Sequence, residues 1–402
     1  MKKIIAVFLA VSMLAGFGIT LKPGQEIVAA AAAPTFKDIS GHWAKESIEA
    51  AVKAGVLNGY PDQTFKPQNP ITRAELLKVI ALTNKIAPAA SSAGRPWYSV
   101  YQTALLDNKI YAAGDFTGDI NKPVTRVEMA KLAIRGANAD YRGVKLTAEE
   151  LMFRAVNAGL LSRTGTKADT IDPDGTTTRA QAAVIVTRLL KLANGGKLTT
   201  DQGASSAAEI AWHRHNMITM FDQNDLVSFP HVEKIRSNYQ VTIDKLIVLD
   251  PSDKTGYYAE YLDGATYYLG GTTSSGSKGY IFAYKLIGKS LLNSEGVENI
   301  EGSFYMYISG DSGVAYLDKK YRYTDKSLQE RQGLFTNATL LNLKQAGVEG
   351  HNYHFAFVDK NYIKNQIKEL GGVSIHLEKF GMGFGDKKSQ IYLTELKDIW
   401  YK

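Results

Sequence analysis

The feature that most constrains this chain is a Thr-Arg pair that returns at a fixed interval. The three copies are spaced 53 residues apart and stand at Thr72-Arg73, Thr125-Arg126 and Thr178-Arg179. Each pair opens an apolar segment with helical spacing, whereas the letters between the copies differ. A repeat of this length indicates one supersecondary unit that is used three times.

The first copy shows what one unit contains. "FKDISGHWAKESIEAAVKAGVLNGY" predicts a turn with Asp38 or Ser40 as N-cap, followed by a helix that ends at Gly55. The loop "NGYPDQTFKPQNP" comes next, and a second helix is expected from Thr72 to Thr83.

The other two copies follow the same course. In the third, "LTAEELMFRAVNAGLL" predicts a capping box of Thr147 and Glu150 and a helix that ends at Gly159. One helix-loop-helix unit cannot bury its apolar faces alone. Three of them should therefore stack about a common axis.

The threonine and the acid of each pair have a local explanation. Thr72 and Glu75 have capping-box spacing, in which each side chain accepts from the backbone amide of the other residue. Thr125 and Glu128 repeat the motif, and the third copy uses Gln181. Capping does not explain the arginine between them, because the helix dipole disfavours a cation in the first turn.

Two explanations of the arginines remain open, and one arginine can satisfy both. Free N–H groups, the positive end of the dipole and a guanidinium together suit a carboxylate or phosphate ligand, which is the explanation we favour. The alternative is pairing with a protein carboxylate in a neighbouring loop, namely Asp38, Asp62, Asp119 or Asp174.

Residues 35–193 resemble three tandem S-layer homology (SLH) domains. The resemblance rests on the first-copy sequence above, on "WYSVYQTALL" with "KPVTRVEMAKLAIR", and on "TTTRAQAAVIVTRLL". It implies an all-α pseudo-trimeric SLH helix bundle whose grooves bind a pyruvylated secondary cell-wall polysaccharide. The pyruvate ketal carries a carboxylate, which is the anion that the arginines suit.

The motifs of this family also suggest which residues contact the ligand, with Trp43 either lying against a sugar ring or anchoring the core. The candidates are Asp38, Trp43, Gly59, Arg73, Glu75, Trp97, Arg126, Glu128 and Arg179. The second copy has Ala112 in place of Gly59, and the third copy lacks the tryptophan and the glutamate. We therefore expect the Arg73 groove to bind best and the Arg179 groove to be weak or structural. On this hypothesis Arg73→Ala removes most wall binding with little loss of helix.

The N-terminus indicates export. Residues 1–31 have the basic start, apolar run and alanine-rich end of a signal peptide, although Ile4 to Leu21 is near the length of a membrane anchor. A net charge of +7 suits a polyanion, and export makes nucleic acid an unexpected partner. The chain has no cysteine, so stability must come from packing rather than disulfides. We expect no membrane contact in the mature form and a cell wall or S-layer location in a Gram-positive bacterium.

The remaining chain has a different composition. The predicted order is SLH repeats at 35–84, 95–137 and 146–193, a linker at 194–208 and a mainly β (or α+β) domain at 209–402. Helices are expected at Ala207 to Phe221 and from Asn361 to Leu370, which Gly371 ends. Aromatic runs around Asp263-Gly264 predict a hairpin. Further strands are predicted in "YIFAYKLIG", "SFYMYIS", "GVAYLD", "HFAFVD", "VSIHLEKF" and "IYLTEL".

The C-terminal domain shows no clear chemical motif. His213 and His215 should lie on different helix faces, His351 and His354 lack an acidic partner, and "GMGFG" is typical of a loop. Glutamates such as Glu260, Glu298 and Glu301 occur in any β domain. We therefore predict no metal, no cofactor and no enzyme activity. The expected function is an S-layer-type surface protein with an outward structural or adhesive domain that can self-associate. The alternatives are an SLH-tethered polysaccharide-acting enzyme and a surface receptor.

Overall fold

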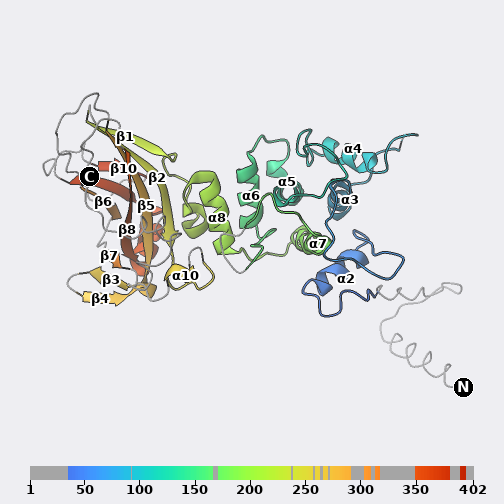
Figure 1. Ribbon diagram of the computed structural model, residues 1–402, viewed down its shortest axis with the longest axis horizontal. Helices are drawn as coiled ribbons and strands as arrows, with labels where there is room; N and C mark the ends of the chain where they lie inside the picture. The colour runs from blue at the N-terminus through green and yellow to red at the C-terminus, as the bar shows by residue number, and fades with distance from the viewer. Residues whose placement is uncertain are drawn as a thin grey trace, which may run out of the picture.

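The computed structural model has a helical N-terminal part and a C-terminal part that contains β-sheet (Figure 1). It describes residues 35–91, 93–165, 171–236, 239–256, 259–262, 266–269, 272–290, 303–308, 313–316, 349–380 and 390–394. The predicted signal peptide lies outside these residues. Across the described ranges, no helix combines the length and apolarity needed to cross a bilayer.

Six α-helices and a short 3₁₀ turn at Ala139–Tyr141 make up the described helical repeats. They are α2 (Lys45–Lys53), α3 (Arg73–Thr83), α4 (Ser99–Asp107), α5 (Arg126–Ala137), α6 (Ala148–Asn157) and α7 (Arg179–Ala193). The predicted second helix of the first copy is confirmed as α3. The predicted helix ends at Gly55 and Gly159 are also confirmed, because both glycines have positive φ, +71° and +73°.

The N-cap predicted for the first helix is wrong. Helix α2 begins after Ala44, which makes no side-chain cap bond. The Asp38 carboxylate instead accepts from the amides of Phe65 and Lys66 at 2.8 and 2.7 Å. It therefore closes the loop that leads to α3, and no ligand role is needed to explain it.

The three predicted capping boxes at the Thr-Arg pairs are confirmed in full at α3, α5 and α7. The box predicted at α6 is only half formed. Thr147 accepts from the Glu150 amide, but the Glu150 carboxylate pairs with Arg154 at 3.0 Å instead of reaching back.

The segments just before these helices are joined in a closed ring of backbone hydrogen bonds. Val124 donates to Ile71 at 2.9 Å, Ile71 donates to Thr177 at 3.1 Å, and Thr177 donates to Val124 at 2.9 Å. All three side chains are buried. Each copy therefore depends on the other two for its backbone pairing, as expected of units that cannot fold alone.

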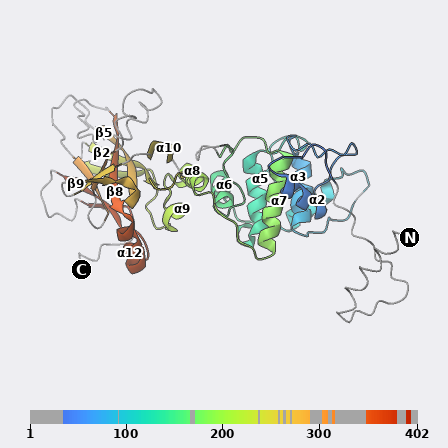
Figure 2. The ribbon, with the colours of Figure 1, turned by 90° about the horizontal axis from the view of Figure 1, so that it is seen from below.

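The linker predicted at 194–208 is wrong in its second half. Helix α8 (Gln202–His213) begins there with Asp201 as N-cap, and Ala204, Ala207 and Ala208 pack into the same core as the three repeats. Figure 2 shows α8 between the helical part and the sheet. Small alanine side chains let the helix approach α6 closely, and their low complexity in the sequence resembles that of a flexible linker.

The single helix predicted from Ala207 to Phe221 is two helices. Arg214 adopts a left-handed conformation, φ 62°, after α8, and the short α9 (Met217–Phe221) follows. Asn216 at this break donates to the Val248 carbonyl at 2.8 Å and accepts from its amide at 2.7 Å. The break therefore attaches the helical part directly to the sheet.

A seven-stranded antiparallel sheet in the order β1-β2-β5-β8-β7-β3-β4 and a three-stranded sheet, β10-β9-β6, form the described C-terminal strands. Their bounds are β1 His231–Arg236, β2 Tyr239–Leu249, β3 Thr266–Leu269, β4 Thr272–Ser275, β5 Gly279–Ser290, β6 Ser303–Ile308, β7 Gly313–Tyr316, β8 Glu349–Asp359, β9 Ile375–Phe380 and β10 Gln390–Tyr392. A 3₁₀ turn at Gly276–Lys278 precedes β5. Each of the six strand segments predicted after the aromatic hairpin overlaps a described strand.

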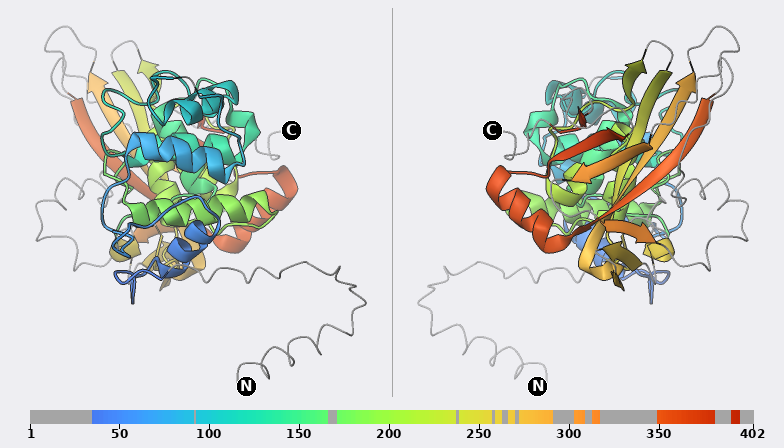
Figure 3. Two further views of the ribbon diagram at one scale, coloured as in Figure 1. Left: turned by 90° about the vertical axis from the view of Figure 1, so that its right-hand side faces the viewer. Right: turned by 90° about the vertical axis from the view of Figure 1, so that its left-hand side faces the viewer.

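Helices cover both faces of the larger sheet. Helix α12 (Lys360–Leu370), with Gly371 as its left-handed C-cap, confirms the predicted helix and packs Ile363 on one face. Figure 3 shows it beside the sheet. The opposite face packs against Leu262 and against Ile210 of α8. Leu262 belongs to α10 (Ala259–Leu262), so the first arm of the predicted aromatic hairpin is helical and that prediction is wrong there. Asp263-Gly264, "GMGFG", Glu298 and Glu301 lie outside the described residues.

Candidate functional site

The three arginines of the repeat occupy equivalent positions but have different partners. Arg73 donates through Nε and Nη2 to both carboxylate oxygens of Glu128, at 3.1 and 2.7 Å. Its Nη1 donates to the carbonyls of Thr117 and Asp119. Both side chains of the ion pair are buried. The Arg73 guanidinium is therefore fully used inside the protein.

Arg179 makes a weaker version of the same contact. It donates to the carbonyls of Phe65 and Asn58, at 2.9 and 2.6 Å, and its Nη1 lies 3.9 Å from Glu75 Oε1. The guanidinium also stacks over the rings of Tyr60 and Phe65. Its charge is partly neutralised by a half-exposed acid.

Arg126 has no acidic partner at all within ion-pair distance among the described residues. It donates to the carbonyls of Ile171 and Ser162, at 2.8 and 2.7 Å, although its side chain is only 6% exposed. The third copy has Gln181 at the helix position where the first two copies have Glu75 and Glu128. The Gln181 Oε1 accepts from the Thr178 amide at 2.9 Å. Burial lowers the pKa of Arg126. The negative charge of Asp172 opposes this shift, and the positive charge of Arg188 adds to it.

The geometry corrects two expectations about these arginines. None of the carboxylates considered from the sequence pairs with them, since the acidic partners of Arg73 and Arg179 lie in the helix start of another copy. The helix N–H groups are not free either. The first two amides of α3 donate to the carbonyls of Lys122 and Ile120, and those of α5 and α7 make the equivalent bonds. An anion could therefore be bound only by side chains.

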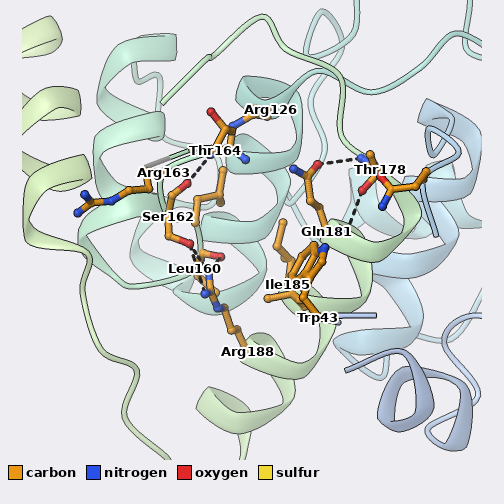
Figure 4. A pocket seen from close by; sticks show the side chains of 14 residues that line it. Trp43, Arg126, Leu160, Ser162, Arg163, Thr164, Thr178, Gln181, Ile185 and Arg188 are labelled. Atoms are coloured by element: carbon orange, nitrogen blue, oxygen red, sulfur yellow. Dashed lines mark hydrogen bonds between the residues drawn. The ribbon is translucent and has the colours of Figure 1, made fainter. Parts of the chain in front are cut away.

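A pocket of about 400 Å³ lies beside Arg126, where the three repeats meet (Figure 4). Trp43 comes from the first repeat, Arg126 from the second, and residues 160–165 with Arg188 from the third. None of the fourteen lining residues is acidic. Trp43 is 63% exposed, so its alternative role as a core anchor is wrong.

Two cations in this pocket, Arg126 and Arg188, have no carboxylate within ion-pair distance among the described residues. Arg188 donates to the Leu160 carbonyl at 2.9 Å and lies 3.5 Å from Ser162 Oγ, both uncharged. Burial lowers the pKa of Arg188, and Asp201 opposes that shift. Arg163, by contrast, pairs with Asp201, and its side chain points away from Trp43 in Figure 4. Two arginines and an exposed indole suit a carboxylate joined to an apolar ring face, such as an acidic sugar.

The other predicted site residues lie elsewhere. Trp97 is 54% exposed and packs edge-on against Tyr98 and Tyr101, outside the pocket. A Cβ at Gly59 would lie 1.9 Å from the Phe36 ring, so this glycine is explained by packing. Of the nine candidates, the pocket brings together only Trp43 and Arg126. Sequence analysis missed Arg188, although it lies one repeat length after Arg135, which is a detectable signal.

The histidines of the junction are close together, contrary to prediction. His213 Nδ1 lies 3.3 Å from His215 Nε2 because the helix ends between them. Burial and His215 lower the pKa of His213. His215 also contacts Glu209 at 3.0 Å. Within the described part of the chain there is no group of three or more side chains able to hold a metal ion. His351 and His354 lie within β8.

Comparison with known proteins finds a family similarity in the first repeat. Residues 35–77 match the S-layer homology domain. Exoglucanase XynX of Acetivibrio thermocellus is 28% identical over 205 residues, 44% of this chain and 18% of that protein. The cellulosome-anchoring protein of the same species is 54% identical over 44 residues, 11% of this chain and 10% of that protein. The S-layer protein sap of Bacillus anthracis is 27% identical over 203 residues, which are 46% of this chain and 24% of that protein. The chain therefore spans less than a quarter of the length of each of these relatives.

Proposed function

We propose that this chain, in which residues 35–77 are an S-layer homology domain, is a surface protein held non-covalently at the bacterial cell wall by its helical part. Its wall ligand is a pyruvylated secondary cell-wall polysaccharide, and the ligand site is the pocket between Trp43 and Arg126. The observation that carries the proposal is a buried arginine, Arg126, that has no carboxylate within ion-pair distance among the described residues and borders an open pocket whose lining side chains include no acid.

The chemistry of a pyruvate ketal fits the pocket. Its carboxylate can accept from the Arg126 and Arg188 guanidinium groups, and charge-assisted hydrogen bonds of this kind are about twice as strong as neutral ones. The sugar that carries it has an apolar face of C–H bonds, which can lie against the exposed Trp43 indole. The ligand would also remove the like-charge interaction between the two arginines.

We also infer that the helical part is a pseudo-trimeric bundle of three tandem SLH domains at 35–84, 95–137 and 146–193. The 53-residue spacing and the closed ring of hydrogen bonds through Ile71, Val124 and Thr177 support this extension beyond residues 35–77. The basic and apolar N-terminus supports export, and we propose a Gram-positive envelope as the location.

The C-terminal domain is assigned an outward structural or adhesive role within the same proposal, including self-association in a surface lattice. The competing proposal is a tethered polysaccharide-acting enzyme, and the observation that supports it is the similarity to an exoglucanase. Release of reducing sugars from a panel of glycans by the full chain would favour the enzyme.

Two substitutions and one control test the pocket. Arg126→Gln and Trp43→Ala should each weaken binding of the full chain to purified, pyruvylated wall polymer by at least tenfold, since each removes one half of the proposed contact. Trp97→Ala is the matched control, because Trp97 is a similarly exposed tryptophan outside the pocket. It should change the affinity less than threefold. Equal binding by all four proteins would reject the pocket as the wall site.

A further inference from the structure

The third copy of the repeat carries glutamine where the first two carry glutamate. We propose that this position selects which groove accepts an acidic ligand. Glu128, and to a lesser degree Glu75, fills the anion position of its groove with the protein's own carboxylate, whereas Gln181 leaves that position open beside Arg126. The inference rests on the proposed function and adds a rule for which groove binds and why only one does.

The contacts of the three arginines form a graded series. The shortest arginine-acid distance is 2.7 Å for Arg73 and Glu128, and 3.9 Å for Arg179 and Glu75. For Arg126 no described carboxylate lies within 4.0 Å. Since the three helix starts share the same capping boxes, the backbone does not cause this difference. For Arg126, the difference comes from the side chain at the third helix position, because Gln181 has no carboxylate where the other two copies have glutamate.

A second pair of arginines shows the same contrast between an arginine with an internal acidic partner and one without. Arg135 and Arg188 are separated by the repeat length of 53 residues. Arg135 donates to the Asp115 carboxylate at 2.6 Å, and both side chains are buried. Among the described residues, Arg188 donates hydrogen bonds to the uncharged Leu160 carbonyl and Ser162 hydroxyl and to no carboxylate. Arg73 and Arg135 are thus neutralised internally, whereas their counterparts 53 residues later, Arg126 and Arg188, both line the pocket.

An internal carboxylate is a strong competitor for a ligand. It is tethered beside the guanidinium, so its effective concentration is millimolar or higher and does not fall on dilution. A bidentate arginine-carboxylate pair also fixes the geometry that an incoming acid would need. A sugar carboxylate can therefore bind at Arg126 without displacing a described protein carboxylate, whereas at Arg73 it would have to displace Glu128.

Glutamine opens the groove without harming the helix that carries it. The Gln181 carbonyl oxygen still accepts from the Thr178 amide, so the capping box survives the loss of charge. The amide nitrogen is a donor and cannot accept a hydrogen bond from a guanidinium. The substitution therefore leaves Arg126 charged and unpaired in a folded site.

Two substitutions at this one position test the inference in the full chain. The probe is a short oligosaccharide of the wall polymer that carries one pyruvate ketal, titrated by calorimetry. Gln181→Glu supplies the internal acid and should weaken binding at least tenfold. Gln181→Met removes the amide without adding charge and should keep the affinity within threefold. Circular dichroism at 222 nm checks that both variants are folded.

Each outcome is decisive. A tenfold loss confined to Gln181→Glu supports the inference, as does a parent stoichiometry of one oligosaccharide per chain. Equal losses in both variants would show that Gln181 contacts the ligand, and unchanged binding in both would show that position 181 is irrelevant. Either result overturns the proposal that position 181 selects the groove. If the parent itself fails to bind the oligosaccharide, the proposed function fails first.

Discussion

Arg73 and Arg126 show how one residue type at one repeat position acquires two roles. Arg73 holds Glu128 in a buried ion pair, and Arg126 borders an open pocket. Sequence alone predicted the capping boxes, because the atoms that form them lie within four residues of each other. It could not predict the arginine partners, which come from another copy, 55 residues away for Arg73 and 104 (179 − 75) for Arg179, and depend on how the repeats close into a ring. The Arg73 groove was expected to bind best because its copy matches the family motif most fully, and we propose Arg126 instead because it has no acidic partner among the described residues.

At the residue scale, Arg73→Ala should destabilise the protein rather than selectively abolish wall binding. The substitution leaves the Glu128 carboxylate buried without its partner, which costs about 3–5 kcal/mol. The free energy of unfolding, measured by urea titration, checks this. Arg126→Ala is the comparison and should cost less, because no buried carboxylate loses a partner. A cost below about 1 kcal/mol for Arg73→Ala would contradict the structural role.

At the scale of elements, local signals predicted most helices and strands but failed where packing decides. Gly55, Gly159 and Gly371 each mark a helix end because a left-handed conformation there favours glycine. The first half of helix α8 was missed because its small residues are buried only by packing into the core of the repeats. The turn of His213 to Asn216 was missed for a related reason, since Asn216 pairs with β2, far along the chain.

Thr177 offers a test of the ring that joins the repeats. It occupies the ring position held by Ile71 and Val124, and its buried hydroxyl has no hydrogen-bond partner among the described residues. Thr177→Val should therefore stabilise the helical part by about 1 kcal/mol, because it removes a buried hydroxyl whose loss of hydration is not offset by a hydrogen bond to any described residue. Chemical denaturation followed by circular dichroism at 222 nm measures this change in the free energy of unfolding.

The reverse substitution at the equivalent position is the control. Val124→Thr places a second hydroxyl in the ring and should destabilise by a similar amount. If Thr177→Val lowers stability as Val124→Thr does, then the hydroxyl contributes to the fold and the two ring positions are not equivalent.

On the scale of the whole molecule, the pocket and the sheet are physically connected. Arg163 lines the pocket, pairs with Asp201 at the start of α8 and donates to the Thr255 carbonyl beyond β2. Burial raises the pKa of the Asp201 carboxyl, but hydrogen bonds from Arg163 and backbone amides outweigh it and hold the pKa below its ordinary value. The stabilisation from this pair is therefore complete above the ordinary aspartate range and is lost as the pH falls through the folded pKa.

The direct test of the central claim is binding of the full chain to one wall polymer before and after mild acid removes its pyruvate ketals. The ketal carboxylate is the group assigned to Arg126 and Arg188, so the intact polymer should bind at least tenfold more tightly than the treated polymer. Adding salt should narrow that difference, because the contact is between charges. Equal affinity for the two polymers at low salt would contradict the account, since the pocket would then bind something other than the acidic sugar.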